Sequence, residues 1–467
     1  MNLTDGQRQK SQNEQLALAF MTESEGEARR AAHEGTEPFA ATSDLESPAR
    51  DDGLMEQICA RENLITAWQR VRANGGSPGV DNRSIDDTVA YLREHWPSIR
   101  DQVLQGTYQP QPVKRVKLPK PGGGFRNLGI PTVLDRLIQQ AILQVLQPQW
   151  DPTFSEYSFG FRPERSAHQA VAQAQAYVAE GYDWTVDIDL EKFFDQVNQD
   201  MVMGRAAKRI SDKRLLKLLR AFLKAGVMEN GIVSPTEAGT PQGSPLSPLL
   251  SNLILDELDQ ELTRRGLRFC RFADDCHIYV RSQRAGERVM SSISRFLTKR
   301  LRLKINGSKS AVAPVGERSF LGFCIRGTRK RQRHIAPEAL QRFKARVRRL
   351  TRRTLGVNLS RMIGRLATYM RGWVAYFGFC QTPWVLHELD AWIRRRLRMV
   401  LWKQWRSGPN RFAQLRKRGI SRDHAAIAAG ARSGYWRMSR HITVQQALPN
   451  AYFFALGLPR LESACRA

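Results

Sequence analysis

Two adjacent carboxylates, Asp274 and Asp275, are the residues of this sequence best placed to do chemistry. Apolar residues alternate on both sides of the pair within Phe269–Val280, the period-two pattern of two strands joined by a turn. Two like charges ~4 Å apart repel by roughly 4 kcal/mol at an effective dielectric of ~20. A divalent cation turns that repulsion into binding, and Mg²⁺ prefers one or two carboxylates plus substrate phosphates. The pattern indicates a magnesium site at a hairpin tip or, alternatively, an acidic turn facing water.

A third carboxylate comes from a β-rich run upstream, Trp184–Asp195. Asp187 and Asp189 occupy one face of this predicted strand, because successive side chains alternate between faces. If the strand ends beside the Asp274–Asp275 hairpin, it supplies a third ligand, which is enough to hold two metal ions. Taken alone, the run is better explained as an edge strand with solvated acids.

A basic hairpin with a glycine tip precedes both acidic stretches. Val113–Lys120 alternates apolar and basic residues, Pro121–Gly124 forms a tight turn, and Phe125–Ile130 returns. Glycines let backbone amides approach an anion closely, and Lys120 and Arg126 flank the tip, where they could grip a triphosphate. Basic hairpins that bind no phosphate are common, so this signal is weak by itself.

Composition points to a polyanionic partner. The chain has 467 residues, a net charge of +28 and 42% apolar residues, which suits a protein of several domains with real cores. Residues 1–53 hold five Lys and Arg against 11 Asp and Glu, whereas residues 326–418 hold 25 against three. So lopsided a basic segment favours nucleic acid as the partner over a merely solvated basic face.

The six cysteines form no C-x-x-C pair, so neither a zinc site nor a disulfide framework is indicated. We expect reduced thiols in a cytoplasmic protein. The sequence contains no run of 18 apolar residues and no signal-peptide pattern at its N-terminus. A membrane is therefore not expected among its partners.

The remaining periodicity predicts helices around these strands. Ser166 and Gln169 form a capping box that opens one helix, and the Gly- and Pro-locked loop Gly239–Pro248 is rigid enough to present Gln242 to a substrate. The other predicted elements are helices over 54–71, 132–147, 215–225, 249–264, 287–301 and 337–353, a strand over 320–325, and a helical bundle over 360–405 in which Tyr369, Trp373 and Phe377 are core rather than base-stacking residues.

Eight short stretches occur in one order along the chain: Asn74–Asp81, Lys120–Pro131, Gly160–Pro163, Asp189–Asp195, Pro241–Gly243, Phe272–Asp275, Asn306–Lys309 and Phe320–Phe323. In this order they resemble the group II intron-encoded reverse transcriptases, also called maturases. The region around Arg371–Trp373 resembles the family's thumb, or maturase, domain, and the resemblance covers about residues 54–467. Phe272 and Phe159 stand where the family commonly has Tyr, which keeps the ring and loses a hydroxyl.

The resemblance implies an α+β fold of the right-hand polymerase type, with fingers, an antiparallel palm sheet and an α-helical thumb or maturase domain. The expected segments are a disordered acidic extension (1–53), fingers and palm (54–330), the helical thumb or maturase domain (331–410) and a short basic nucleic-acid-binding tail (411–467). Because no C-x-x-C pair follows the thumb, we expect no cysteine-paired nuclease domain.

The resemblance also implies a metal centre. Asp189 and Asp274 would bridge two Mg²⁺ ions, for which Mn²⁺ can substitute, and Asp275 would be a supporting ligand. These three aspartates are the expected catalytic residues.

Five further residues are implied to contact the nucleotide. Lys120 and Arg126 would clamp the triphosphate, and Lys309 would give a proton or charge to the leaving pyrophosphate. Phe194 would lie under the sugar and exclude a 2′-hydroxyl, while Gln242 would touch the nucleotide or the template.

The implied activity is RNA-directed DNA synthesis from dNTPs on an RNA template with a DNA primer. The chain would also bind a group II intron RNA, assist its splicing and promote its insertion into target DNA. Two alternatives remain open: a host-adapted reverse transcriptase that serves repair or defence, and an RNA-binding maturase with a vestigial polymerase site. An RNA-dependent RNA polymerase also uses an Asp-Asp turn, but Phe194 and the Pro241–Gly243 loop favour deoxynucleotides.

Overall fold

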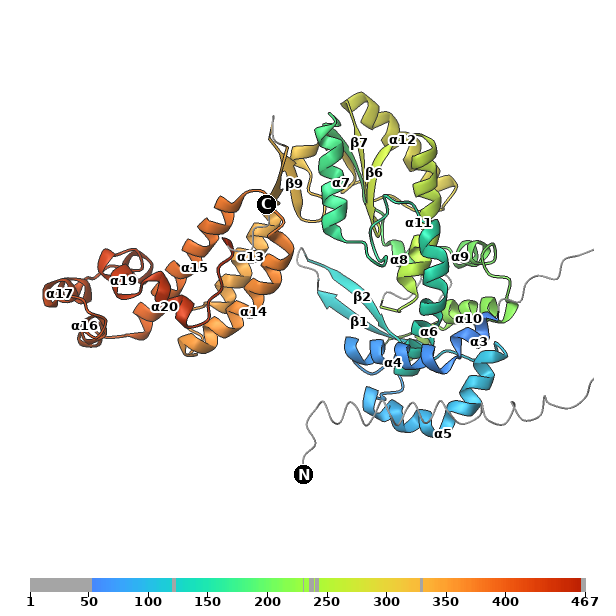
Figure 1. Ribbon diagram of the computed structural model, residues 1–467, viewed down its shortest axis with the longest axis horizontal. Coiled ribbons are helices and arrows are strands. Elements are labelled where there is room, and N and C mark those ends of the chain that lie inside the picture. The colour runs from blue at the N-terminus through green and yellow to red at the C-terminus, as the bar shows by residue number, and fades with distance from the viewer. Residues whose placement is uncertain are drawn as a thin grey trace, which may run out of the picture. The chain divides into compact units, whose positions relative to one another are not determined.

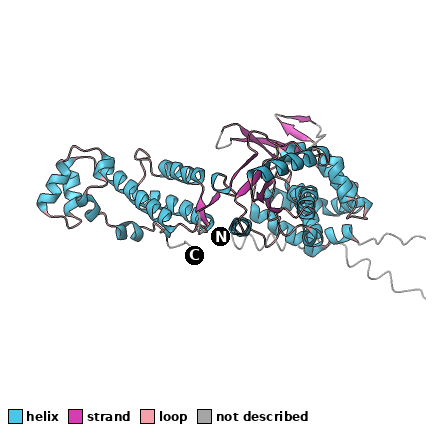
Figure 2. Ribbon diagram, turned by 90° about the horizontal axis from the view of Figure 1, so that it is seen from above, coloured by secondary structure: helices cyan, strands magenta, loops and turns pink. Residues whose placement is uncertain are grey.

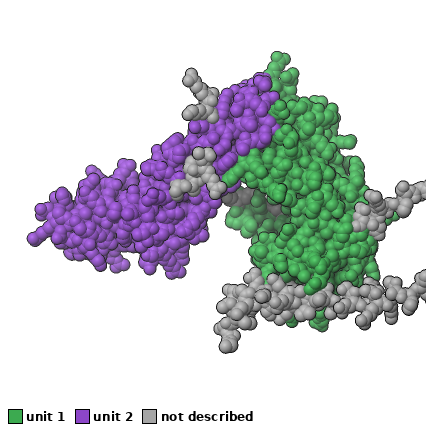
Figure 3. Space-filling view, in the orientation of Figure 1, with its two compact units in different colours: residues 1–170, 186–280, 284–312 green, residues 171–185, 281–283, 313–467 purple. Residues whose placement is uncertain are grey.

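The computed structural model describes residues 53–119, 123–229, 231–234, 239, 243–327 and 331–462. Two compact units are present (Figure 3). Unit 1 comprises the described parts of 1–170, 186–280 and 284–312, and unit 2 comprises those of 171–185, 281–283 and 313–467. Apart from Gly53, the predicted acidic extension lies outside the described residues. The predicted segment boundaries at 330 and 410 stay a prediction.

A four-stranded sheet carries the acidic stretches. Its strand order is β6 (Arg268–Phe272), β7 (Asp275–Val280), β3 (Trp184–Ile188) and β8 (Ala311–Pro314). β6 and β7 are antiparallel, and Phe272 pairs with Asp275. The predicted hairpin is therefore confirmed, and Ala273 and Asp274 form its two-residue turn.

Helices cover this sheet closely (Figure 1). α11 (Ser247–Arg264) packs against β6, and α12 (Gln283–Lys299) approaches the other three strands at Gly286, which lies near Val280, Val186 and Val312. Gly286 in α12 has no room for a side chain, because a Cβ there would lie 2.5 Å from Val312 and 3.4 Å from Val280. Gly286 thus lets α12 pack closely on one face of the sheet, in which every residue of β7 from Cys276 to Val280 is buried.

A second sheet confirms the basic hairpin. Its order is β2 (Phe125–Ile130), β1 (Val113–Pro119), β4 (Val227–Glu229) and β5 (Ile232–Ser234), with β1 antiparallel to β2 and parallel to β4. Glu229 pairs with Lys117 at 2.6 Å and with Arg115 at 3.4 Å, which adds charge contacts to the short β1–β4 pairing.

The other helices of unit 1 are α3 (Leu54–Ile58), α4 (Arg61–Asn74), α5 (Ile85–Leu104), α6 (Val133–Trp150), α8 (Phe193–Gln196), α9 (Gln199–Ala206) and α10 (Lys213–Lys224). The single helix predicted over 54–71 is in fact two helices. Ala60 is extended, and the Asn63 side chain donates to the Ile58 carbonyl at 3.0 Å, which satisfies one end of the broken helix. Neither Gly nor Pro marks this break in the sequence.

α7 (Ala167–Ala179) begins with the predicted capping box: the Ser166 amide donates to Gln169 Oε1 at 2.7 Å, and the Gln169 amide donates to Ser166 Oγ at 3.3 Å. The helix starts in unit 1 and ends in unit 2.

Unit 2 also contains an antiparallel pair, β9 (Phe323–Arg326) and β10 (Gln332–Ile335). The strand predicted from Phe320 starts only at Phe323, because Leu321 and Gly322 have φ of 51° and 81° and form a turn. The backbones of Phe320 and Phe323 close that turn with hydrogen bonds of 2.8 and 3.0 Å.

The C-terminal elements are all helices (Figure 2). They are α13 (Pro337–Leu350), α14 (Leu359–Phe377), α15 (Pro383–Gln404), α16 (Gly408–Arg416), α17 (Arg422–Gly430), α18 (Tyr435–Met438), α19 (Ile442–Ala447) and α20 (Asn450–Ala455). The fully buried Phe343 stacks on Tyr369, at 5.6 Å between ring centroids, and packs against Trp373 at 4.2 Å. The predicted core position is confirmed for Trp373, which is buried, whereas Tyr369 and Phe377 are half-buried at the edge of this aromatic cluster. The mixed helix–strand fold with a helical C-terminal region is confirmed.

Across the described ranges, the structure contains no helix with both the length and the apolar character needed to span a bilayer.

Candidate active site

The acidic turn has a strained backbone at Ala273, whose φ is 59°. A left-handed conformation costs roughly 1–2 kcal/mol for a residue with a Cβ. The turn is nevertheless held, because Nη1 of Arg271 donates to the Ala273 carbonyl at 2.8 Å. The side chain of Arg271 thus fixes Ala273, the residue immediately before Asp274.

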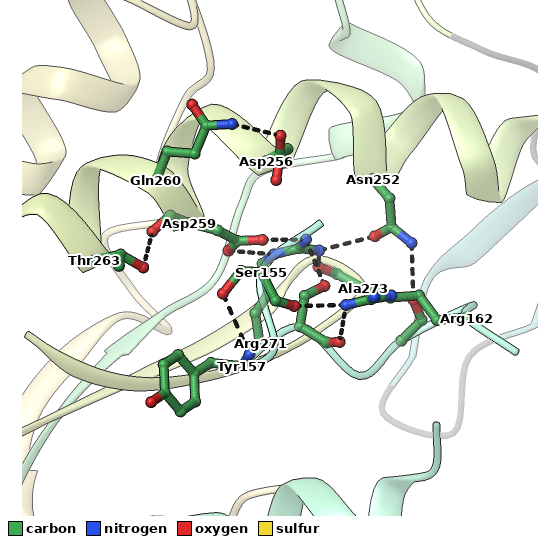
Figure 4. Close-up of polar contacts among 12 residues, drawn as sticks. Ser155, Tyr157, Arg162, Asn252, Asp256, Asp259, Gln260, Thr263, Arg271 and Ala273 are labelled. Carbon is green, nitrogen blue, oxygen red and sulfur yellow. Dashed lines mark hydrogen bonds and ion pairs between the residues drawn. The ribbon is translucent and has the colours of Figure 1, made fainter. Parts of the chain in front are cut away.

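Arg271 is fully buried and uses all its donors (Figure 4). Nε and Nη2 bind the two carboxylate oxygens of Asp259 at 2.7 and 2.6 Å, and Nη1 also donates to Asn252 Oδ1 at 3.0 Å. The last donor reaches Ser158 Oγ at 2.7 Å. A guanidinium has five N–H groups, and here each has a partner, which is the condition for burying this charge. We call these residues, Arg271, Asp259, Asn252 and Ser158, the arginine brace.

The backbone around Gly160 lies against the acidic turn. The Phe159 amide donates to the Arg271 carbonyl at 2.8 Å, and Asn252 Nδ2 donates to the Gly160 carbonyl at 2.9 Å. A Cβ at position 160 would overlap the backbone nitrogen of Ala273, so only glycine fits. This contact gives a physical reason for the Gly in the Gly160–Pro163 stretch.

Arg162 holds the same stretch, Gly160–Pro163, in place. Its Nε and Nη2 bind the Asp151 carboxylate at 2.8 and 3.2 Å, and Nη1 donates to the Ser158 carbonyl at 3.0 Å. Ser158 therefore connects two buried arginines, through its carbonyl to Arg162 and through its hydroxyl to Arg271.

Asp189 is held on both sides of its backbone by the turn Asn306–Ser310. Its amide donates to Ser310 Oγ at 2.9 Å, and its carbonyl accepts from the Asn306 amide at 2.9 Å. Lys309, on the same turn, places Nζ 3.2 Å from Asp189 Oδ2. The turn thus fixes the backbone of Asp189 and puts a cation beside its carboxylate.

The aspartates influence one another electrostatically. Burial raises the pKa of Asp274, with a further contribution from Asp189, while Arg126 and Arg271 act in the opposite direction. Burial also raises the pKa of Asp275 to about 6, helped by Asp187, Asp274 and Asp189 and opposed by His277. Since 41% of the Asp275 side chain is exposed, the carboxyl is enclosed on one side and still reachable from solvent.

This group of carboxylates is short of positive charge. Hard divalent cations take oxygen ligands, and a bound cation favours the charged form of carboxylates whose pKa is raised by burial and by neighbouring acids. The residues present therefore fit Mg²⁺.

Two of the five predicted nucleotide contacts, Lys120 and Gln242, lie outside the described residues. The nearest described residues before and after Gln242 are Gly239 and Gly243. The Gly239 amide donates to the Val197 carbonyl at 2.7 Å, and a Cβ on Gly243 would lie 2.5 Å from the Gly129 carbonyl. Arg126 is close enough to Asp274 to lower its pKa.

Phe194 lies in α8, five residues after Asp189, and contributes to a cavity of about 450 Å³. The other lining residues include Phe161, Arg136 and Gly243. None of the three aspartates lines this cavity, so the position of Phe194 beside a bound nucleotide stays a prediction.

Sequence reasoning missed the arginine brace and His277. Arg271 stands between Cys270 and Phe272 in a strand, and Asp259 falls within the apolar face of α11. A charged residue at an inward strand position, together with an acid on an apolar helix face, is the signal that could have found the brace.

Two protein families match parts of the chain. Residues 118–325 match the family described as "Reverse transcriptase (RNA-dependent DNA polymerase)", and residues 340–419 match "Group II intron, maturase-specific domain". Both matches fall on the elements described above: the first covers the acidic turn and Asp189, and the second covers α14 and α15.

Among curated relatives, "Protein YkfC" of Escherichia coli (strain K12) is 33% identical over 321 residues, which are 60% of this chain and 84% of that protein. "Group II intron-encoded protein LtrA" of Lactococcus lactis subsp. cremoris is 37% identical over 222 residues, which are 47% of this chain and 36% of that protein. The match thus spans about a third of the second relative's length. A solved structure described as "Partial Cas6-RT-Cas1--Cas2 complex" is 25% identical over 53% of this chain and 42% of its own, with a TM-score of 0.35, too low to support a comparison of folds.

Breaking the arginine brace should destabilise the protein. In Arg271→Met the carboxylate of Asp259 stays buried without its partner, which costs about 3–5 kcal/mol. Arg264→Met, on the same helix as Asp259, removes an exposed partner of Glu261 and should change the stability far less. Urea unfolding measures both. The double variant Arg271→Met/Asp259→Leu should recover part of the loss, and equal stability of the two single variants would contradict the brace.

Proposed function

Because the chain belongs to the group II intron type of reverse transcriptase with a maturase-specific domain, we propose that it is an RNA-directed DNA polymerase that also binds a group II intron RNA. The supporting observation is that Asp189 lies near enough to Asp274 and Asp275 to shift their pKa values, although the chain separates them widely. Retention of all three aspartates disfavours a vestigial polymerase site.

Asp189 and Asp274 would hold two Mg²⁺ ions, with Asp275 as a supporting ligand. When bound, such ions activate the primer 3′-hydroxyl and neutralise charge on the triphosphate. The protein contributes the placement: the arginine brace fixes the turn that carries Asp274, and the Asn306–Ser310 turn fixes Asp189. Rigid placement of charged groups lowers the reorganisation needed during the reaction.

The cations around this centre would bind the nucleotide. Arg126 lies on β2 within electrostatic reach of Asp274, so a triphosphate held by the metal ions would meet its guanidinium. Lys309 already pairs with Asp189 and could shift to the leaving pyrophosphate, giving it charge or a proton. By resemblance, Lys120 completes the clamp and Gln242 touches the nucleotide or template.

Phe194 would select deoxynucleotides. A ring under the sugar leaves no room for a 2′-hydroxyl, and this exclusion is steric, so no polar group is required. Its position near the start of α8, five residues after Asp189, supports this role.

The helical part of unit 2 would bind the intron RNA. Residues 326–418 carry 25 Lys and Arg against three acids, and many of these arginines lie on the outer faces of helices whose aromatic residues form the core. Such a surface contacts phosphates, as expected for a maturase that helps its intron fold for splicing and insert into target DNA.

Replacing one proposed metal ligand should stop DNA synthesis without releasing RNA. Asp274→Asn should slow primer extension by on the order of 10³-fold or more, because bound metal supplies several kcal/mol of transition-state stabilisation. RNA affinity should stay near that of the wild type. The control is Asp200→Asn, an exposed acid paired with Arg220. Near wild-type extension by Asp274→Asn would refute the assignment.

Enlarging the proposed sugar site should admit ribonucleotides. Phe194→Val should raise kcat/KM for GTP relative to dGTP by about 10- to 200-fold, the range for small steric changes in a pocket. Phe161→Ala opens the same cavity without touching the proposed sugar position, so its selectivity should not change. If both variants lose discrimination equally, the cavity is merely loosened and Phe194 is not the gate.

RNA binding should depend steeply on salt, because each phosphate contact releases counterions. The association constant of the Asp274→Asn variant for a structured RNA is measured between 50 and 200 mM salt and plotted against salt concentration on logarithmic axes. If six or more phosphates are contacted, the constant should fall by about 10³-fold or more over this range. A flat response would contradict binding through the basic helices.

A further inference from the structure

A third group of possible ligands adjoins the proposed polymerase centre. Asp275 and His277 are two residues apart on β7, so they share one face, and Asp187 lies on the neighbouring strand β3. Nε2 of His277 lies 3.4 Å from Asp187 Oδ1 and 3.5 Å from Asp275 Oδ1. One ligand atom from each residue falls within 4.8 Å of the other two. We call Asp187, Asp275 and His277 the histidine site.

These separations are long for hydrogen bonds. An N–H···O bond is usually about 2.9–3.0 Å long, and contacts near 3.6 Å no longer count as bonds. A tetrahedral ion with bonds of about 2.0–2.1 Å to nitrogen and oxygen has ligand atoms about 3.3–3.4 Å apart. The observed separations of 3.4 and 3.5 Å match the edges of such a tetrahedral site.

The ligand types of the histidine site favour a different metal ion from the one proposed for the polymerase centre. The proposed Mg²⁺ ligands are all carboxylates, whereas the histidine site adds an imidazole, which suits zinc and related transition metals. The His277 side chain is only 3% exposed, and its Nε2 is directed at both carboxylates. A buried imidazole between two carboxylates is an arrangement of ligands that a solvated acidic turn does not have.

We propose that Asp187, His277 and Asp275 form a transition-metal site of the zinc type beside the polymerase centre. Three protein ligands leave the fourth position of a tetrahedral ion open to water. A metal ion bound at the histidine site would take Asp275 away from its supporting role at the polymerase centre, so micromolar Zn²⁺ would inhibit DNA synthesis. That consequence rests on the proposed function, whereas the metal site itself does not.

Direct metal binding tests the site without any activity. Co²⁺ serves as the probe, because it absorbs visible light when bound in four- or five-coordinate sites with nitrogen and oxygen ligands. Titration of the Mg²⁺-free full chain should give one such site per chain. His277→Asn and Asp187→Asn should each weaken it by about 10²-fold or more, since losing a ligand costs at least as much as losing its second-shell support.

The matched control is His95→Asn, which removes an exposed histidine 3.8 Å from the Glu94 carboxylate. It should leave the Co²⁺ site unchanged, because one surface histidine beside one acid is not a built site. Circular dichroism verifies that each variant is folded, and Asp187→Asn provides a second test if His277→Asn is not. Undiminished Co²⁺ binding in a folded His277→Asn variant would overturn the proposal.

Inhibition of primer extension at fixed Mg²⁺ separates this site from the polymerase centre. Zn²⁺ should inhibit the wild type and inhibit His277→Asn at least about 10-fold less. Equal inhibition of both proteins would place the effect at the all-carboxylate centre and contradict the consequence drawn for Asp275. Histidine-dependent Co²⁺ binding in a chain that extends no primer would keep the metal site and refute the proposed function.

Discussion

The structure depends on keeping several carboxylates together against their mutual repulsion. Asp189 comes from one place in the sequence and the adjacent Asp274 and Asp275 from another, and burial raises the pKa of both members of the Asp-Asp pair. Without bound cations this arrangement is unfavourable, so the scaffold beneath it must be rigid. Arg271 and Asp259 provide that rigidity, since their buried ion pair fixes the carbonyl of Ala273 and thereby the turn.

The scaffold also explains why glycine and arginine occur where they do. Gly160 leaves room for the backbone of Ala273, and Arg162 holds the Gly160–Pro163 stretch through Asp151. On the other side of the centre, the Asn306–Ser310 turn grips the backbone of Asp189. Two supports that share no residue thus hold the residues of the proposed metal centre. A substitution in one support can therefore be tested while the residues of the other stay unchanged.

Much of the centre could be predicted from the sequence, because its elements have strong local signals. The alternation around Asp274 and Asp275 predicted the hairpin, and the capping box of α7 follows from Ser166 and Gln169. The arginine brace has a weaker signal. A lone Arg in a strand usually faces water, and although Asp259 falls on an apolar helix face, only the tertiary fold places it opposite Arg271. The break between α3 and α4 was missed for a related reason, since it is stabilised by the Asn63 side chain rather than by Gly or Pro.

The central claim is that the three aspartates hold two divalent cations between them. Anomalous diffraction from crystals grown with Mn²⁺, a primer–template and a non-reactive dNTP tests it most directly. The account predicts two Mn²⁺ peaks about 3.5–4 Å apart, both in contact with carboxylate oxygens of Asp189 and Asp274. A map with Asp189 still paired to Lys309, and no metal between it and Asp274, would contradict the account.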